Sequence, residues 1–333
     1  MATLWAQVLA LLDGHHLEAV GSRAPDRVPR LAATFSARQA ELAELGQLAE
    51  IVVVASAPPN HASDVLAAIR AGAAAVVETP LCTTLADADA LVAAVAVGAR
   101  VAYGENLLFA PLVREALHLA ADLGPLRYLE ARVAQKPSRR WSNQNASWGG
   151  GALFDVGSHP LAIMLTLAQQ DQPVAVQARF ERRVSSAPDA VEDLAEVQLQ
   201  FASGARGYLM VSTTAEDPQW DLQVATEDST LRLELLPHPH LELHGVDRPS
   251  RPRRFEGIEP SQLETFGYLD QAWENGRDLL LHPGPAWLGA TFGRYVLDVV
   301  CAAYRSAGSG HPETLPFSGP RHLTPWQQWQ QQD

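Results

Sequence analysis

The sequence predicts an α/β fold in which a parallel-sheet domain precedes an α+β domain with an open, mostly antiparallel sheet. Helix-like and strand-like segments alternate through the first hundred residues, as in doubly wound domains. Residues 50–55 (EIVVVA) form a β-branched run, typical of a parallel strand buried on both faces. Between residues 174 and 243 apolar and polar residues alternate, which indicates antiparallel strands with one face toward water.

Each element of the first domain, residues 1–105, follows from its local pattern. Apolar residues at helical spacing predict helices, and short apolar runs predict strands. The expected helices cover residues 4–12, 25–40, 62–71 and 85–97, and the expected strands cover 16–22, 50–55, 74–78 and 100–103.

In the second domain, residues 106–333, helix-like and strand-like segments no longer alternate regularly. Ahead of and after the alternating strands, we expect a strand over 126–135 and helices over 111–123, 153–167, 262–276 and 286–305. The closing residues WQQWQQQD are expected to form a frayed tail.

Composition excludes several classes of protein. Lys and Arg number 25 against 38 Asp and Glu, so the net charge of −13 disfavours nucleic acid as a partner. No segment has the roughly 18 consecutive apolar residues of a membrane span, and the N-terminus lacks the basic start of a signal peptide. Two cysteines without CxxC or metal-ligand spacing fit a cytoplasmic protein without a metal site.

Four segments in register resemble the glucose–fructose oxidoreductase / inositol dehydrogenase (Gfo/Idh/MocA) family. They are residues 57–82 (APPNHASDVLAAIRAGAAAVVETPLC), 104–111 (GENLLFAP), 149–159 (GGGALFDVGSH) and 302–317 (AAYRSAGSGHPETLPF). The resemblance implies a Rossmann domain followed by an α+β domain whose sheet often forms dimer interfaces. It also implies oxidation or reduction of sugar and polyol carbinols with a nicotinamide cofactor.

Asp155 and His159 match the Asp and His of the family's catalytic set. Positions i and i+4 share a helix face, so both side chains can point the same way and the carboxylate can orient the imidazole. His159 would then be the general acid/base and Asp155 its orienting partner. In isolation such a pair is more often a helix cap and a packed histidine, but the glycine-rich segment before it favours a site.

The chain departs from the family at the catalytic lysine, because Thr79 stands in that position. Threonine donates one hydrogen bond but carries no charge. Either activity is lost, or another group replaces the lysine. Lys136, the one lysine of the chain, leads into a polar loop that by resemblance borders the substrate cleft, although solvation is the commoner fate of a surface lysine.

The N-terminus departs as well, since residues 1–12 already look like the family's first helix. The first strand and the G-x-G-x-x-G turn that binds the pyrophosphate are missing from the sequence. Two explanations compete: a misassigned start codon, or a shortened chain with weakened or absent cofactor binding.

Candidate cofactor and substrate residues follow from the resemblance. Ser22 and Arg23 stand where an acidic residue would bind the ribose of NAD and suit the 2′-phosphate of NADP, although a solvated Arg is an equal alternative. The other expected cofactor-binding residues are Ala55, Pro58, Asn60, His61, Glu78 and Asn106. The expected substrate contacts are Arg140, Trp141 and Trp148.

Three functions remain open. The leading one is an NAD(P)-dependent oxidoreductase, with NADP slightly favoured over NAD, acting on a small-molecule sugar, polyol or cyclic ketone as a homodimer or homotetramer. The second is a catalytically silent relative that binds a metabolite or partners an active enzyme. The third is a non-redox enzyme that uses the same cleft.

Overall fold

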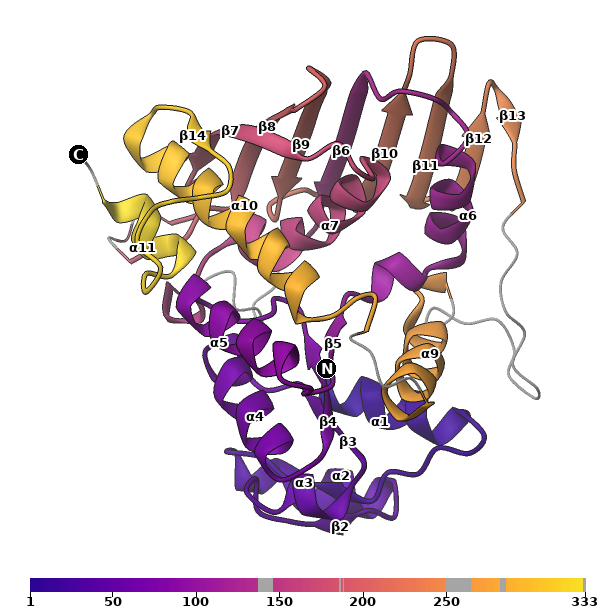
Figure 1. The fold of residues 1–333 in the computed structure, drawn as a ribbon, viewed down its shortest axis with the longest axis vertical. Helices are drawn as coiled ribbons and strands as arrows, with labels where there is room; N and C mark the ends of the chain where they lie inside the picture. The colour runs from indigo at the N-terminus through magenta and orange to yellow at the C-terminus, as the bar shows by residue number, and fades with distance from the viewer. Residues whose placement is uncertain (137–145, 186, 188, 250–264, 282–285, 332–333) are drawn as a thin grey trace. The chain divides into compact units, whose positions relative to one another are not determined.

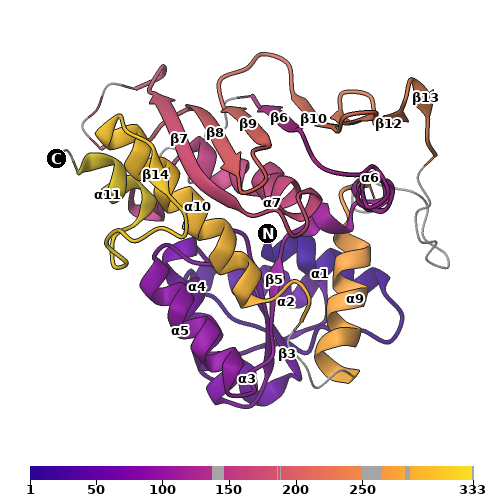
Figure 2. The ribbon, with the colours of Figure 1, turned by 45° about the horizontal axis from the view of Figure 1, so that its top comes forward.

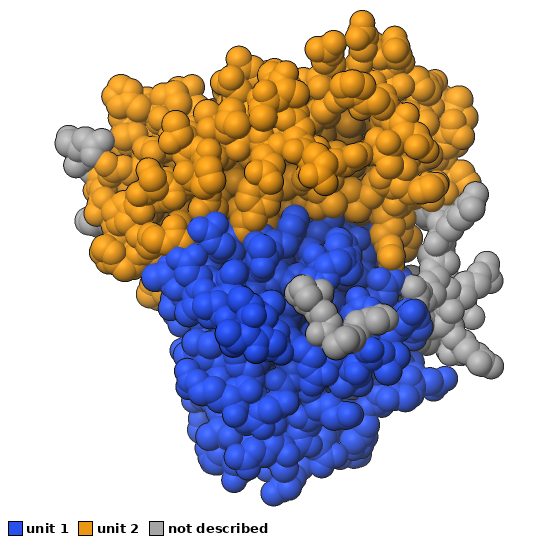
Figure 3. Space-filling view, viewed as in Figure 1, with its two compact units in different colours: residues 1–82, 86–110, 253–294 blue, residues 83–85, 111–252, 295–333 orange. Residues whose placement is uncertain are grey.

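The computed structural model describes residues 1–136, 146–185, 187, 189–249, 265–281 and 286–331 (Figure 1). It divides into two compact units (Figure 3). Unit 1 comprises residues 1–82, 86–110 and 253–294; unit 2 comprises residues 83–85, 111–252 and 295–333. The sequence placed everything after residue 105 in the second domain, whereas helix α9 (Tyr268–Leu281) belongs to unit 1. It does so because its Leu269 and Ala272 share a hydrophobic core with Trp5 and Val76.

Unit 1 contains the predicted parallel sheet. Strands β3 (Ile51–Val54), β4 (Ala74–Glu78) and β5 (Val101–Gly104) pair in the order β3-β4-β5. Helices α4 (Pro58–Arg70) and α5 (Leu85–Ala96) connect them. Every residue of β4 and β5 is buried, as their apolar composition predicts for central parallel strands. The expected strand–helix alternation is therefore confirmed.

The N-terminal part of unit 1 begins with helix α1 (Ala2–Leu11) and contains a separate parallel pair, β1 (Ala19–Val20) with β2 (Arg38–Gln39). The helix predicted over residues 25–40 is shorter than expected. It comprises the 3₁₀ turn η1 (Pro25–Arg27) and α2 (Val28–Thr34), followed by Ser36 with a φ of 54°. A left-handed residue interrupts a helix, and residues 38–39 pair with β1 instead. The short helix α3 (Leu45–Leu48) precedes β3.

Unit 2 is built on one nine-stranded sheet in the order β13-β12-β11-β10-β6-β9-β8-β7-β14. Neighbours are antiparallel except β6 and β9, which are parallel. The strands are β6 (Tyr128–Ala134), β7 (Pro173–Glu181), β8 (Leu194–Phe201), β9 (Arg206–Ser212), β10 (Gln219–Ala225), β11 (Thr230–Leu236), β12 (His240–Leu243), β13 (Val246–Asp247) and β14 (Glu313–Thr314).

Helices cover one face of this sheet. Figure 2 shows α7 (Ser158–Leu167) and α6 (Pro111–Ala120) on the same side of the strands. Along β8, Val197 and Leu199 are buried while Gln198 and Gln200 are exposed, so apolar residues face the helices and polar residues face away. The mostly antiparallel second sheet is confirmed.

The chain closes with helices α10 (Ala290–Ser309) and α11 (Pro325–Gln330). The expectation of a frayed tail is wrong for the described residues to 331. Thr324 and Gln327 form a reciprocal capping box at the start of α11, which satisfies two backbone N–H groups there. Among the described residues, no helix combines the length and apolarity that crossing a membrane requires.

Candidate active site

Asp155 and His159 lie on one continuous helical segment of unit 2. Asp155 is in a π-helical turn, η5 (Leu153–Gly157), and His159 is in the first turn of α7. The Asp155 N–H donates to Gly151 O at 3.0 Å, and the Ser158 hydroxyl donates to Asp155 O at 3.2 Å. Single π turns within helices are rare and concentrate at functional sites.

The exposure pattern separates these two side chains from their neighbours. From residue 149 to residue 165 every residue is buried except Asp155 and His159, which are partly exposed. The accessible groups of this otherwise buried segment are therefore a carboxylate and an imidazole. Such groups can act together as a general acid/base pair.

Thr79 is the partly exposed residue at the carboxyl end of β4, between the buried Glu78 and Pro80. Its N–H donates to Glu78 Oε2 at 3.3 Å. The other carboxylate oxygen of Glu78 accepts a hydrogen bond from the indole N–H of Trp5 in α1. Glu78, an expected cofactor contact, is therefore engaged inside unit 1. Trp5 was missed by the sequence reasoning, because nothing local to α1 indicates its partner.

His61 lies inside unit 1, with 1% of its surface exposed. Its Nδ1 is 2.8 Å from Pro80 O and its Nε2 is 3.0 Å from Ser56 O. Burial lowers the pKa of His61, although both carbonyls act in the opposite direction. The ring thus ties the segment after β3 to the Thr79–Pro80 turn after β4.

Arg23 and Ser22 also have partners within unit 1. The Arg23 guanidinium donates two hydrogen bonds to Asp64 at 2.8 and 2.5 Å, and the Ser56 hydroxyl donates to the same carboxylate at 2.7 Å. The Ser22 hydroxyl accepts from the Ala24 N–H at 3.0 Å. Asp64 was not anticipated, since its distance in sequence hides the pairing.

The remaining expected cofactor residues fall into two groups. Ala55 and Asn60 are partly exposed, whereas Pro58 is buried at the start of α4. Asn106 is buried, and its side-chain amide donates to Phe266 O at 2.7 Å.

The expected substrate residues are less fully described. Arg140 and Trp141 lie outside the described residues. Trp148 is partly exposed in the 3₁₀ turn η4 (Ala146–Trp148), and Lys136 is exposed just after β6. Within the described chain, no group of three or more His, Cys, Asp or Glu side chains is arranged to hold a metal ion.

In doubly wound folds, a dinucleotide binds at the carboxyl ends of the parallel strands. Because the strands are parallel, Ala55, Thr79 and Glu105 follow their ends at one edge of the sheet, where ligands of doubly wound folds bind. The partly exposed Asn60 amide and Thr79 hydroxyl there are donors and acceptors suited to ribose and carboxamide groups.

Both the sequence and the fold of this chain resemble those of known proteins. The profile of the GFO/IDH/MocA C-terminal domain matches residues 113–233, and that of the oxidoreductase family with an NAD-binding Rossmann fold matches residues 2–104. No curated protein sequence matches the chain.

Three solved structures illustrate the similarity. GenD2 from gentamicin A biosynthesis, solved in complex with NAD, is 27% identical with a TM-score of 0.82, covering 95% of this chain and 93% of that one. An oxidoreductase domain protein from Kribbella flavida is 20% identical (TM-score 0.81; 95% and 96% covered). The aldose-aldose oxidoreductase of Caulobacter crescentus, complexed with glycerol, is 23% identical (TM-score 0.78; 93% and 95% covered). At 20% and 23% identity, the similarity to the last two proteins shows a shared fold and nothing more.

Proposed function

This chain belongs to the Gfo/Idh/MocA family of oxidoreductases, and we propose that it is an NAD-dependent dehydrogenase that oxidises a sugar or polyol carbinol and, in the reverse direction, reduces the corresponding ketone. The observation that carries the proposal is the selective exposure of Asp155 and His159 on an otherwise buried segment. The solved complex of GenD2 with NAD, at 27% identity, supports the choice of cofactor.

The chemistry assigns a role to each of the two side chains. Oxidation of a carbinol removes a hydride from carbon and a proton from oxygen, and bound NAD supplies the hydride acceptor. His159 accepts the hydroxyl proton on a ring nitrogen, and Asp155 orients the imidazole and stabilises its charged form. In the reverse direction His159 returns that proton to the carbonyl oxygen.

Thr79 and Lys136 are further elements of the proposal. The Thr79 hydroxyl supplies one neutral hydrogen bond where the family's lysine would supply a charged one. Lys136 is the alternative source of positive charge for the substrate oxygen. Arg140, Trp141 and Trp148 are proposed to contact the substrate by ion pairing or stacking on a sugar ring.

NAD rather than NADP is the proposed cofactor. The preference for NADP predicted from the sequence depended on Ser22 and Arg23. The Ser22 hydroxyl accepts from the Ala24 N–H, and Asp64 neutralises the Arg23 guanidinium with two hydrogen bonds. A 2′-phosphate would have to displace a carboxylate that already provides bidentate geometry.

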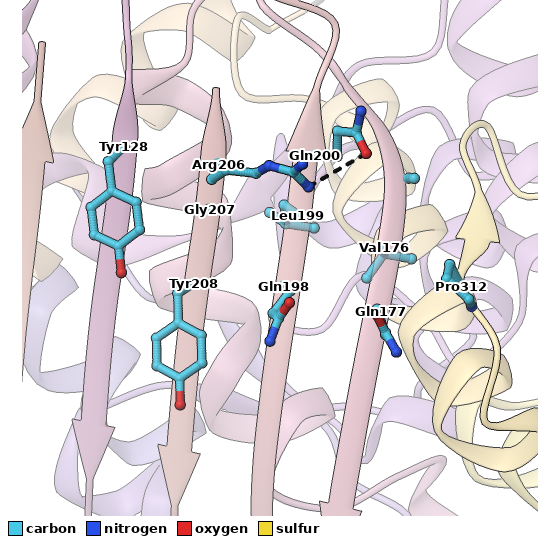
Figure 4. Close-up of a pocket in the computed structure, with 11 residues that line it drawn as sticks. Tyr128, Val176, Gln177, Gln198, Leu199, Gln200, Arg206, Gly207, Tyr208 and Pro312 are labelled. Carbon is cyan, nitrogen blue, oxygen red and sulfur yellow. Dashed lines mark hydrogen bonds between the residues drawn. The ribbon is translucent and has the colours of Figure 1, made fainter. Parts of the chain in front are cut away.

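We also propose that the protein forms a homodimer or homotetramer through the face of the second sheet that its helices leave uncovered. A shallow hollow of about 440 Å³ lies on this face, and its lining includes Tyr128, Gln198 and Tyr208 (Figure 4). Tyrosine is enriched at protein interfaces. Sedimentation equilibrium tests this proposal, and a monomer at all concentrations would contradict it.

Cofactor titration followed by an activity assay tests the proposed reaction. We expect NAD or NADH to bind saturably at micromolar concentrations and quench tryptophan fluorescence. A panel of aldoses, polyols and cyclic ketones, each followed by NADH absorbance, should then contain a substrate. A cofactor that fails to bind would contradict the proposal.

A catalytically silent relative is the second candidate, favoured by Thr79 in place of the family's lysine. It predicts cofactor or metabolite binding without hydride transfer to any member of the panel. The Thr79→Lys variant separates the two candidates, because turnover that appears only in this variant would identify a silent relative.

A further inference from the structure

A buried carboxylate lies directly beneath the turn that leads into the Asp155–His159 segment. Glu192, just before β8, is 0% exposed. Its Oε2 accepts a hydrogen bond from the Gly151 N–H at 3.1 Å, and its Oε1 accepts one from the Leu153 N–H at 2.9 Å. Its own backbone oxygen accepts a hydrogen bond from the Ala152 N–H at 2.9 Å. One residue thus binds three consecutive N–H groups at the start of the π turn.

Tyr304 of α10 completes the arrangement from a third element of unit 2. Its hydroxyl donates to Glu192 Oε1 and accepts from the Gly151 N–H at 2.8 Å. The ring is fully buried and packs edge-on against Phe180 of β7, with centroids 4.7 Å apart. Tyr304 is the titratable side chain that contacts Glu192 within the described chain.

The glycines of this turn are explained by the same contacts. A Cβ at position 151 would clash with the backbone and carboxylate of Glu192, and a Cβ at position 150 would come 2.5 Å from the Tyr304 hydroxyl. Glycine is therefore required for close approach to these two residues. The backbone N–H of Trp326 in α11 donates to Gly149 O at 2.7 Å.

We propose that Glu192 is a positioning residue, whose carboxylate, oriented by Tyr304, fixes the backbone of residues 151–153 and thereby aims Asp155 and His159. This inference rests on the proposed function, because it takes those two side chains as the reacting pair. A carboxylate is suited to the task, since two backbone N–H groups and one hydroxyl need three acceptor positions. An amide has a single acceptor oxygen, and its NH₂ group would face N–H or O–H donors where the second carboxylate oxygen now accepts a hydrogen bond.

The Glu192→Gln variant tests the proposal. The assay is run at pH 8, where the Glu192 side chain is ionised because its pKa is about 7. We expect kcat to fall at least tenfold, while the dissociation constant for NAD and the KM for substrate each change less than twofold, because cofactor and substrate contacts remain. The matched control is Glu227→Gln, at an exposed glutamate just after β10 whose carboxylate accepts from the Arg127 guanidinium at 3.2 Å. A Glu192→Gln variant with kcat within twofold of wild type would overturn the inference.

A second variant covers the case in which Glu192→Gln does not fold. Tyr304→Phe keeps the ring against Phe180 and removes only the hydroxyl, so kcat should fall three- to tenfold with the same unchanged binding constants. An unaltered kcat in this variant would also overturn the inference.

Amide hydrogen exchange distinguishes failure of this inference from failure of the proposed reaction. The N–H groups of Gly151 and Leu153 should exchange slowly in the wild type and faster in Glu192→Gln, whether or not a substrate is found. If exchange is equally slow in both proteins, Glu192 does not hold the turn. If exchange accelerates and kcat is unchanged, the turn does not aim the pair.

Discussion

The guanidinium of Arg23 and the carboxylate of Asp64 form a two-point ion pair, with N–O distances of 2.8 and 2.5 Å. The hydrogen bond to Asp64 is the main cause of a raised pKa at Arg23. Arg23 follows β1, where doubly wound folds recognise the adenosine ribose. In the proposed function, this ion pair occupies the guanidinium that a 2′-phosphate of NADP would need.

Asp64→Asn should shift cofactor preference toward NADP. The variant frees a guanidinium for charge-assisted hydrogen bonds to phosphate, so we expect the ratio of NADP to NAD affinity to rise by roughly tenfold. Fluorescence titration with both cofactors measures this ratio. Asp26→Asn, at an exposed residue of η1, is the control. An unchanged ratio would show that Arg23 does not face the ribose.

His159→Ala should abolish the general acid/base. We expect kcat to fall by about a hundredfold or more, with little change in the dissociation constant for NAD, because His159 is proposed to take the hydroxyl proton of the substrate and not to hold the cofactor. Steady-state kinetics on the substrate found in the panel provides the test. His118→Ala, on an exposed position of α6, should behave as wild type. Equal turnover in both variants would remove His159 from the mechanism.

The sequence predicted those parts of the molecule whose signals are local. The β-branched run at residues 50–55 became β3, and the spacing of Asp155 and His159 correctly predicted that they lie on one helical segment. The end of α2 at Thr34 was missed, because Ser36 adopts a positive φ in a chain segment with no glycine.

The parts that escaped prediction depend on partners distant in sequence. Glu192 reaches Leu153 across 39 residues, and Tyr304 reaches Gly151 across 153. Glu192 lies among alternating residues, where an acidic side chain ordinarily indicates the face toward water. Periodicity alone cannot identify a carboxylate that is buried because three donors meet it.

Trp329→Ala should destabilise unit 2, because the C-terminal residues form part of its packing. The Trp329 ring lies 5.6 Å from that of Phe180, and the Arg182 guanidinium lies 4.2 Å above it. Removing a partly buried indole should cost about 2 kcal/mol of unfolding free energy. Urea denaturation measures it, with Gln330→Ala as an exposed control. A midpoint equal to that of wild type would contradict the packing role.

Glu192 should make stability depend on pH in the direction opposite to an ordinary ion-paired carboxylate. Burial raises its pKa from 4.5 to about 7, despite the hydrogen bonds from Tyr304 and the backbone that act the other way. The folded state therefore holds this proton more tightly than the unfolded state. The resulting stabilisation is fully present below about pH 4.5 and is lost as pH rises through about 7.

The loss approaches about 3 kcal/mol if the full shift is expressed. Glu192→Gln has no proton to lose, so the difference in unfolding free energy between variant and wild type should move in favour of the variant from pH 5 to pH 8. Urea denaturation of both proteins across this range measures the difference, and the exposed control Glu227→Gln provides the baseline. Parallel profiles for wild type and Glu192→Gln would mean that the carboxyl titrates normally, and would place its charge in contact with water.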